Sequence, residues 1–519
     1  MTDESSSVKR KPWGGRVQEF RPQPVDLKAL VELGAPVTLV QLGLMSMGAV
    51  DTVMVGRVSA AGLAAVALGK LYFLMMAVFG QGVLFALDPV IAQAVGARDS
   101  VGVAHGVQRG LILGVVLAAL AMLLMIPVNP LLTLAGQPEE VVPIAVQYVH
   151  GLILGVFPFY AFGVFRQSLQ AMGRVRAIVL TVLVANVLNA GLNWILIFGN
   201  FGSPRLGAVG SAWATSLSRW FLLGLLVALA WSQLRPTIRP WRRASFDLEP
   251  IIRFIRLGAP IGAQQLLEFG VFGAAGLLMG LLGTVAMASH QVALQLAALT
   301  FMIPVGVAQA TSVVVGQAVG RGEPEAARRA VGAGLVTVTA FMTVTAVTFI
   351  AVPVPLARIF SNDQMVVAAA AALLPIAGVF QIFDGLQVAS AGALRGVADR
   401  RVPMFLNLVG FWLIGLPVSA LLGFKLGAGP RGIWWGLAVG IGVVAVLLLW
   451  RVRALILIPA LVRCCPCLVR RPRSWPFWAD TPRRADHAHA FQAGRLSDPH
   501  FGAFTFFRAG KIPGPLLAK

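Results

Sequence analysis

Long apolar stretches, separated by short polar or Gly- and Pro-containing breaks, run along almost the whole chain. Each stretch has about 20 residues or more, the length at which a helix crosses the hydrocarbon core of a bilayer. The stretches lack the alternation of apolar and polar positions that marks the strands of an outer-membrane barrel, so we expect helices throughout. Twelve spans are predicted: 29–56, 62–95, 104–128, 139–163, 175–199, 206–231, 251–281, 285–319, 327–352, 365–392, 402–424 and 431–462.

The composition supports this reading of the apolar pattern. Of the 519 residues, 57% are hydrophobic and 12% are charged, whereas soluble domains have about 25% charged residues. The sequence therefore predicts an all-α integral membrane protein whose helices lie in a lipid bilayer.

The basic residues of the short loops predict how the chain is oriented. If both termini are cytoplasmic, the inner loops and helix ends carry seventeen Arg residues, while the outer ones carry five basic residues, namely Arg57, Arg205, Arg358, Lys425 and Arg431. An excess of positive charge marks the cytoplasmic side of a membrane protein. We therefore expect a multi-pass protein of the cell (inner) membrane with both termini in the cytoplasm.

The formal net charge of +21 could suggest a nucleic-acid partner. Most of this charge comes from the loop asymmetry and from a basic tail, so we expect no nucleic-acid binding. The tail is rich in Pro and Arg and is predicted to be disordered. Its Cys464, Cys465 and Cys467 are too few and too close together for a disulfide framework, and a proper fourth zinc ligand is lacking.

The second half of the chain repeats the first. When the LGAP motif at Leu33–Pro36 is aligned with the one at Leu257–Pro260, the QAVG motif at Gln93–Gly96 falls on the one at Gln317–Gly320 without a gap. Later in each half, matching glycines are displaced by only one or two further positions. The ungapped agreement of Gly, Pro and Gln positions indicates a duplication rather than a chance similarity of apolar helices.

The repeat divides the chain into two lobes of six helices. Because six is even, both lobes enter the membrane from the same side, so the repeat is parallel with its axis along the membrane normal. Two lobes that rock about a central cleft expose one site to each side in turn, which is a transporter architecture. The predicted units are a cytoplasmic N-terminal segment (1–28), an N-lobe (29–231), a cytoplasmic linker (232–250), a C-lobe (251–462) and the basic tail (463–519).

Four carboxylates lie well inside the apolar spans. On the insertion scale, each costs about 3 kcal/mol at the centre of a helix, so such residues usually face a wet cavity, take up protons or bind a cation. None of the four is reproduced by the repeat, which indicates chemistry rather than architecture. Asp51 falls on Ala275, Asp88 on Ser312, Glu268 on Leu44, and Asp384 near Ala161.

Polar and aromatic side chains share helix faces with these acids, at about 100° per residue. A carboxylate, an amide and an aromatic ring on one stripe suit an organic cation, because they offer charge neutralisation, a hydrogen bond and a cation–π contact. We therefore expect a substrate site that includes Asp51, a stripe with Glu268, Gln264, Gln265 and Phe272, and a stripe with Asp384, Phe380, Gln381 and Gln387.

Each acid also has a structural interpretation. Asp51, Glu268 or Asp384 could be a buried packing residue that is bonded to a neighbouring Gln or Asn. Asp88 is followed directly by Pro89, so its main expected role is to serve backbone groups freed at a kink. Further polar residues in the spans are interpreted as hydrogen bonders between helices rather than as ligands: Asn186, Asn189, Asn193 and His290.

Several motifs resemble the multidrug and toxic compound extrusion (MATE) transporters. VDTVMVG at Val50–Gly56, HQVALQLAALTFMIPVG at His290–Gly306 and FQIFDGLQVASAGALRGVADRRVPM at Phe380–Met404 are similar to the first, eighth and tenth helices of that family. LLEFGVF at Leu266–Phe272 is similar to the seventh helix of its NorM-like branch. The resemblance covers about residues 28–460, and the motifs recur in the family's order.

The resemblance implies a polyspecific exporter that exchanges organic, often cationic compounds for H+ or Na+ through a V-shaped pair of six-helix bundles. By motif, Asp51, Glu268 and Asp384 match the family's acids for coupling to the cation. Glu268 and Asp384 would be metal ligands only if the coupling ion is Na+. We expect no cofactor besides that ion, and a monomer. Asp88 matches no functional acid of the family.

Two other functions fit parts of the sequence. A flippase of lipid-linked sugars shares the duplicated architecture but should have a cationic cavity, whereas the intramembrane charges here are mainly acidic, with Lys70 and Arg219 as exceptions. An intramembrane aspartyl protease could use Asp51 with Asp384, but the FDGL context of Asp384 lacks the Gly-x-Gly-Asp pattern. No phosphate-binding loop is present, so we expect neither an enzyme nor an ATP-driven pump.

Overall fold

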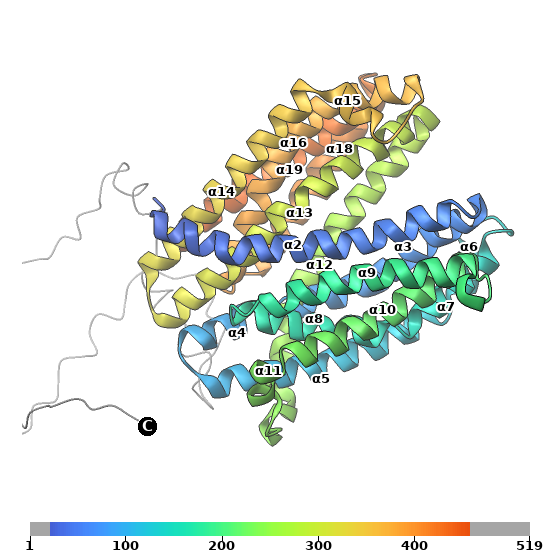
Figure 1. The fold of residues 1–519 in the computed structure, drawn as a ribbon. Helices are drawn as coiled ribbons and strands as arrows, with labels where there is room; N and C mark the ends of the chain where they lie inside the picture. The colour runs from blue at the N-terminus through green and yellow to red at the C-terminus, as the bar shows by residue number, and fades with distance from the viewer. Residues whose placement is uncertain (1–20, 457–519) are drawn as a thin grey trace, which may run out of the picture. The chain divides into compact units, whose positions relative to one another are not determined.

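The computed structural model describes residues 21–456, and this range is helical without strands (Figure 1). Eleven of its helices are long and apolar enough to span a membrane, and the bent pair α7 and α8 makes a twelfth span. The predicted all-α fold with twelve spans is therefore confirmed. The spanning helices are α2 (Pro24–Gly56), α3 (Ala60–Leu84) with α4 (Leu87–Gly96), α5 (Ser100–Met125), α7 (Val142–Ile153) with α8 (Val156–Ala171), α9 (Arg176–Phe198), α10 (Gly207–Leu229), α12 (Leu248–Leu281), α13 (Thr284–Arg321), α14 (Pro324–Ala351), α16 (Gln364–Gly396), α17 to η5 (Arg401–Lys425) and α19 (Gly429–Ile456).

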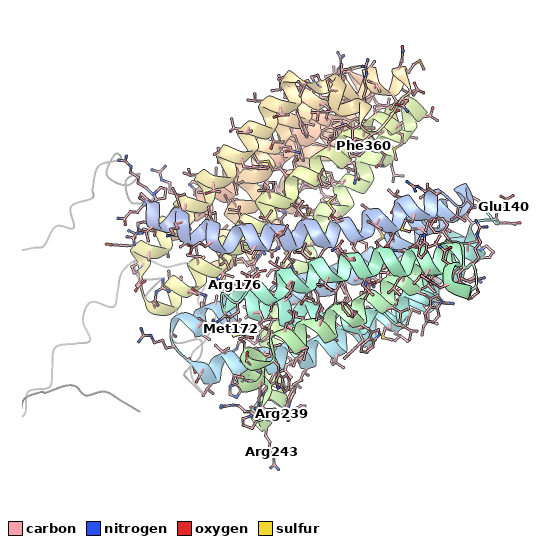
Figure 2. All side chains as sticks on the ribbon, viewed as in Figure 1. Glu140, Met172, Arg176, Arg239, Arg243 and Phe360 are labelled. Atoms are coloured by element: carbon pink, nitrogen blue, oxygen red, sulfur yellow. The ribbon has the colours of Figure 1, made fainter. Side chains whose placement is uncertain are left out.

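Short helices cap the ends of the bundle or lie between the spans. They are α6 (Val128–Leu134), η2 (Asn200–Gly202), α11 (Trp231–Ile238), η3 (Arg243–Phe246) and α15 (Pro353–Arg358). Glu140, which follows α6, and Arg176, which begins α9, lie towards opposite ends of the N-lobe (Figure 2).

Three predicted spans are not continuous α-helices. The span predicted over 62–95 breaks at Phe85 and Ala86, between α3 and α4. The span predicted over 139–163 is bent by 48° between α7 and α8. The span predicted over 402–424 passes through two π-helical segments, η4 (Leu408–Gly415) and η5 (Leu421–Lys425), with the short α18 (Leu416–Ala420) between them. Backbone groups freed at such breaks inside a membrane must be satisfied by neighbouring helices.

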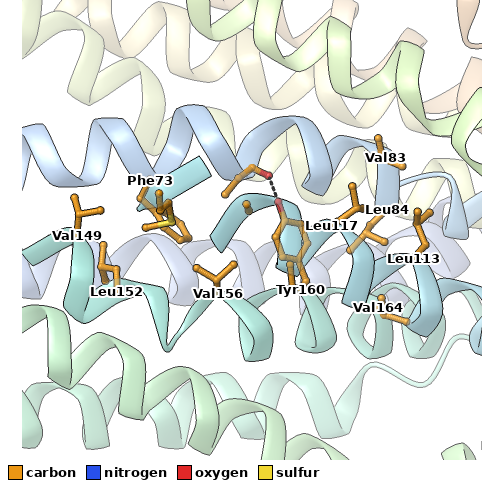
Figure 3. Close-up of a cluster of buried hydrophobic side chains, with 14 of the residues drawn as sticks. Phe73, Val83, Leu84, Leu113, Leu117, Val149, Leu152, Val156, Tyr160 and Val164 are labelled. Carbon is orange, nitrogen blue, oxygen red and sulfur yellow. Dashed lines mark hydrogen bonds between the residues drawn. The ribbon is translucent and has the colours of Figure 1, made fainter. Parts of the chain in front are cut away.

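Each lobe packs around its own apolar core. In the N-lobe, buried side chains of α3, α5, α7 and α8 surround Tyr160, whose hydroxyl donates to the carbonyl oxygen of Ala77 at 3.0 Å (Figure 3). In the C-lobe, buried side chains of α12, α13, α16 and α19 surround Phe380 and Trp434. A smaller cluster joins Leu30 of α2 to buried side chains of α13, α14 and α16, so apolar packing also crosses between the two halves.

The lobes contact each other through two residue pairs, and the internal repeat relates one pair to the other. A Cβ on Gly96 would overlap with the carbonyl oxygen of Gln317, and a Cβ on Gly320 would overlap with that of Gln93. The repeat places Gly96 on Gly320 and Gln93 on Gln317, so it converts the first pair into the second, which is the pattern of an interface with a two-fold axis. Glycine is therefore required at both positions, because α4 and α13 approach too closely for any side chain.

The linker between the lobes is fastened to the N-lobe by one buried side chain. Gln108 of α5 is fully buried, and its amide nitrogen donates to the carbonyl oxygens of Thr237, Ile238 and Pro240 at 3.1, 3.2 and 3.1 Å. Its amide oxygen accepts from the backbone nitrogen of Arg242 at 3.2 Å and from the hydroxyl of Ser245 at 2.6 Å. The linker is thus held against α5 before α12 begins.

We predict that Gln108→Ala destabilises the protein by at least about 2 kcal/mol, because it leaves several buried carbonyl groups without donors. Thermal unfolding in detergent should show a lower Tm. The control is Gln137→Ala, since Gln137 makes one exposed hydrogen bond, to the carbonyl oxygen of Ala135. Equal Tm values for the two variants would contradict the anchoring role of Gln108.

Candidate functional site

Asp51 lies at the centre of a hydrogen-bonded cluster in the N-lobe. It is buried on α2 and accepts from Asn193 of α9 at 2.7 Å and from Thr215 of α10 at 3.0 Å. Asn193 also donates to Asn189 at 3.1 Å, and Asn189 donates to Ser218 at 3.3 Å. The prediction that these Asn residues bond between helices is confirmed, as is that for Asn186, which donates to the carbonyl oxygen of Gly43 at 2.9 Å.

A lysine that the sequence did not assign to this cluster completes it. The ammonium of Lys70 on α3 lies 3.8 Å from an oxygen of Asp51, and it donates to the carbonyl oxygen of Gly48 at 2.7 Å and to the hydroxyl of Thr52 at 2.9 Å. The Lys70 side chain is 31% exposed, so the pair lies at the edge of the cluster. Lys70 could have been flagged from the sequence, because a lone lysine in an apolar span needs a counter-ion as much as an acid does.

A second cation lies near the same acid. The guanidinium of Arg219 on α10 stands 4.2 Å from the ring centre of Phe73 and 5.2 Å from that of Phe159. It interacts electrostatically with both Asp51 and Lys70. The N-lobe cluster therefore holds two cations around one carboxylate.

The C-lobe brings together Glu268 of α12 and Asp384 of α16, as the sequence predicts for one site. The two carboxylates are close enough to interact electrostatically, and Asp384 is buried. Two neighbouring carboxylates repel each other when both are ionised, so a proton or a metal cation bound between them removes that repulsion. The pair thus has the chemistry of a cation site.

Aromatic rings of α12, α16 and α19 pack against one another in the C-lobe. Phe272 meets Phe380 edge-on with ring centres 6.1 Å apart, and Phe380 meets Trp434 at 5.8 Å. His290 is fully buried and packs on Trp434 at 5.7 Å, and within residues 21–456 neither of its ring nitrogens has a hydrogen-bond partner. The prediction that His290 bonds between helices is therefore wrong.

The other residues predicted to contact substrate differ in exposure. Gln264, Phe380, Gln381 and Gln387 are buried between helices, whereas Glu268 and Phe272 are partly exposed. The amide nitrogen of Gln381 donates to the hydroxyl of Thr300 at 2.6 Å and to the carbonyl oxygen of Ala297 at 3.2 Å. In this conformation, Gln381 links α16 to α13 rather than standing free for a ligand.

Asp88 differs from the other three acids. It lies in the first turn of α4 and is fully buried, and across the described part of the chain neither of its carboxylate oxygens accepts a hydrogen bond. The prediction that Asp88 serves freed backbone groups beside Pro89 is therefore wrong. Its electrostatic partners are Arg395 and Arg166.

Between residues 21 and 456, no group of three or more His, Cys, Asp or Glu side chains is arranged to hold a metal ion. The cysteines of the tail lie outside the described residues. The carboxylate pair Glu268 and Asp384 remains the expected place for a coupling cation.

This chain is similar to two bacterial relatives and, in its fold, to two solved structures. The chain is 36% identical over 440 residues to the "Probable multidrug resistance protein NorM" of Rhizobium meliloti (strain 1021), which covers 82% of this chain and 93% of the relative. It is 36% identical over 431 residues to the "Multidrug resistance protein PmpM" of Pseudomonas aeruginosa (strain PAO1), which covers 82% of this chain and 90% of that relative.

The fold matches the crystal structure of the eukaryotic MATE transporter AtDTX14 with a TM-score of 0.78 at 24% identity, over 88% of this chain and 100% of that one. It also matches a structure of MATE in the bent conformation, with a TM-score of 0.76 at 21% identity, over 86% and 98%.

The MatE family description matches the chain twice, over residues 36–195 and 260–421. The two matches begin at Pro36 and Pro260, which are the last residues of the two LGAP motifs that the internal repeat aligns. Together with the relatives, these matches cover both lobes and confirm the resemblance seen in the motifs. The chain therefore belongs to the MatE family of membrane transporters.

Proposed function

We propose that this protein is a secondary active multidrug exporter of the cell's inner membrane, with both termini in the cytoplasm. It exchanges organic, often cationic compounds for H+ or Na+ and works as a monomer without another cofactor. The observation that carries the proposal is the carboxylate pair Glu268 and Asp384, held in the C-lobe of a MatE family chain whose relatives are named multidrug resistance proteins. This function is transport of small molecules rather than catalysis.

The contacts between the lobes support an outward-facing state. The tight pairs of Gly96 with Gln317 and of Gly320 with Gln93 lie next to Arg98 and Arg321, in loops that the excess of positive charge places in the cytoplasm. Asp51 lies near the other end of α2, five residues before the helix ends at Gly56. We infer that the lobes are closed towards the cytoplasm and that the acids communicate with the outer side.

The exchange follows from competition for the same carboxylates. In the outward-facing state, H+ or Na+ binds Glu268 and Asp384 and removes the negative charge that holds a cationic compound, which then leaves outwards. After the lobes rock, the ion leaves to the cytoplasm and a new compound binds. The ion and the compound must each bind the two states differently, since otherwise neither gradient drives the other.

Energetics favour more than one titrating carboxylate. One pH unit supplies ~1.4 kcal/mol per proton, and 100 mV supplies ~2.3 kcal/mol per charge. Exchange of one proton for one monocation moves no net charge, so it sustains only about tenfold accumulation outside. Two protons per monocation supply ~5 kcal/mol, or a few thousandfold. The pair in the C-lobe and Asp51 in the N-lobe provide enough sites for such a ratio.

We predict that Glu268→Gln and Asp384→Asn each reduce efflux driven by an ion gradient by at least about tenfold, the factor that ~1.4 kcal/mol of lost interaction produces. Each substitution removes a charge with little change in volume. Efflux of a fluorescent cation from proteoliposomes, with the pH and Na+ gradients imposed separately, measures the loss and identifies the ion. The control is Glu249→Gln in the first turn of α12, where the acid is exposed and pairs with Arg253. Undiminished efflux in both site variants would remove the pair from the mechanism.

We predict that the affinity for a cationic dye falls as the pH falls, and that Asp51→Asn binds the dye weakly at every pH. Protonation removes the charge of Asp51 and its attraction to Lys70, so the aspartate should lose its hold on a cation at low pH, whereas asparagine never has it. Equilibrium dye binding between about pH 5 and 8 tests this. The control is Asp363→Asn, because Asp363 is an exposed N-cap where asparagine caps equally well. An Asp51→Asn variant that keeps the full pH dependence would exclude Asp51 from coupling.

A further inference from the structure

Asp88 is a buried charge whose partners come from both lobes. It lies where α3 breaks into α4, and within the described residues neither carboxylate oxygen accepts a hydrogen bond. A buried carboxylate without hydrogen bonds is stable as an anion only if cations compensate its charge. The charged groups that act on it are Arg166 of α8, in its own lobe, and Arg395 of α16, in the other lobe. The α5 residues that pack on α4 near it are Gly106 and Gly110.

The C-terminal end of α16 packs against the break between α3 and α4. The guanidinium of Arg395 stands 5.4 Å from the ring centre of Phe85, the C-cap residue of α3. The next residue, Gly396, accepts a hydrogen bond from the side-chain nitrogen of Gln93 at 3.0 Å. Around Pro89, α13 contributes Gly316, which has no side chain to place between the lobes. Arg395 therefore reaches from the C-lobe to the N-lobe at the cytoplasmic end.

A second cation near Arg395 increases the need for an anion there. Arg400 follows α16, and burial, together with the neighbouring Arg395, lowers the pKa of the Arg400 guanidinium to about 9. Arg166 is also buried and donates to the side-chain oxygen of Gln41 at 2.9 Å. Asp399 acts on Arg400, whereas Asp88 is the anion that acts on both Arg166 and Arg395, so loss of its charge leaves these two guanidinium groups with less compensation.

The repeat shows that this charge pair is not part of the duplicated scaffold. Asp88 corresponds to Ser312 in the alignment of the two LGAP motifs, and Arg395 corresponds to Met172 where Gly173 is aligned with Gly396. A similar neutral contact exists on both sides, since Gln317 donates to the carbonyl oxygen of Ala171 at 2.9 Å, two residues before Gly173, the counterpart of Gly396 to which Gln93 donates. The charged pair accompanies only one of these two contacts.

Arg395 also links this contact to the cation site. It interacts electrostatically with Glu268 as well as with Asp88. Asp384 lies eleven residues before it on α16, which is about three helical turns and roughly 16 Å along the same helix face. Arg395 therefore interacts both with Glu268 of the cation site and with Asp88 at the lobe boundary.

We propose that Asp88 is the anionic centre of an inner gate. Its ionised carboxylate attracts Arg395 of the C-lobe across the lobe boundary, together with Arg166 of its own lobe, without a direct ion pair to either, and this attraction holds the cytoplasmic ends of the lobes together. Loss of its charge removes the attraction to Arg395 and lets the lobes part towards the cytoplasm. The gate rests on the proposed function in one respect, which is that the lobes rock during transport.

The test is the labelling rate of a cysteine at the lobe boundary. Ser312→Cys is nearly isosteric, and Ser312 is fully buried in the closed state. In the full-length protein, with Cys464, Cys465 and Cys467 replaced by serine, a membrane-impermeant maleimide on the cytoplasmic side reports opening of the gate. We expect Asp88→Asn to raise the labelling rate by about tenfold or more, and Asp88→Glu to leave it close to that of the parent protein.

A double-mutant cycle separates charge from packing. Arg395→Gln alone should also raise the labelling rate, and if Asp88→Asn fails to fold, Arg395→Gln and Arg395→Lys carry the comparison, with lysine expected to preserve the closed gate. The double variant should label more slowly than the product of the single effects, because either single variant already removes the attraction between Asp88 and Arg395. The control is Asp99→Asn, an N-cap of α5 at the same end of the N-lobe.

An unchanged rate in Asp88→Asn, or single effects that multiply without coupling, would overturn the gate. Labelling does not depend on the exported compound or the coupling ion. Failure of dye efflux in the parent protein would therefore count against the proposed exporter and leave the gate to be decided by the labelling rates.

Discussion

A bilayer offers no hydrogen-bond partners, and this constraint determines how each polar group in the spans is held. Backbone groups are satisfied within helices, but a charged side chain must find its partners on other helices. Asp51 shows the result, because its donors and its counter-ion come from α3, α9 and α10. Apolar packing alone would allow these helices to meet in several ways, whereas the needs of one buried carboxylate select the arrangement in which all three face α2.

The same constraint explains why the two halves are alike in shape but not in charge. Close approach of two helices is a steric requirement that applies equally on both sides of the two-fold axis, so Gly96 and Gly320 are both glycine. A buried charge costs several kcal/mol unless it is compensated. We therefore expect a buried charge only where it has a role in the protein. None of the four acids has an acid at the equivalent position of the other half: Asp51, Asp88, Glu268 and Asp384.

The number and order of the spans could be predicted from the sequence because length and hydropathy determine them. The kink beside Pro89 was also expected, and the break at Phe85 and Ala86 lies where the ring of Pro89 disrupts the preceding turn. The two π-helical segments between Leu408 and Lys425 were not predicted. For the site, the sequence identified the acids but not what surrounds them. Lys70 reaches Asp51 from another helix, and His290 packs on Trp434 instead of donating a hydrogen bond. Helical periodicity gives the face of a residue within its own helix, while its partner depends on how that helix is rotated in the bundle.

The two lobes surround their acids differently. In the N-lobe, a ligand that binds Asp51 must first replace hydrogen bonds and a lysine that already compensate the charge. In the C-lobe, Glu268 and Asp384 repel each other when both are ionised, so a cation that binds there relieves this repulsion, while Arg395 partly compensates Glu268. If both sites take part in transport as proposed, cation binding at Asp51 must compete with Lys70, whereas cation binding at the C-lobe pair relieves the repulsion between two acids. The proposed function therefore calls for different cation affinities in the two lobes.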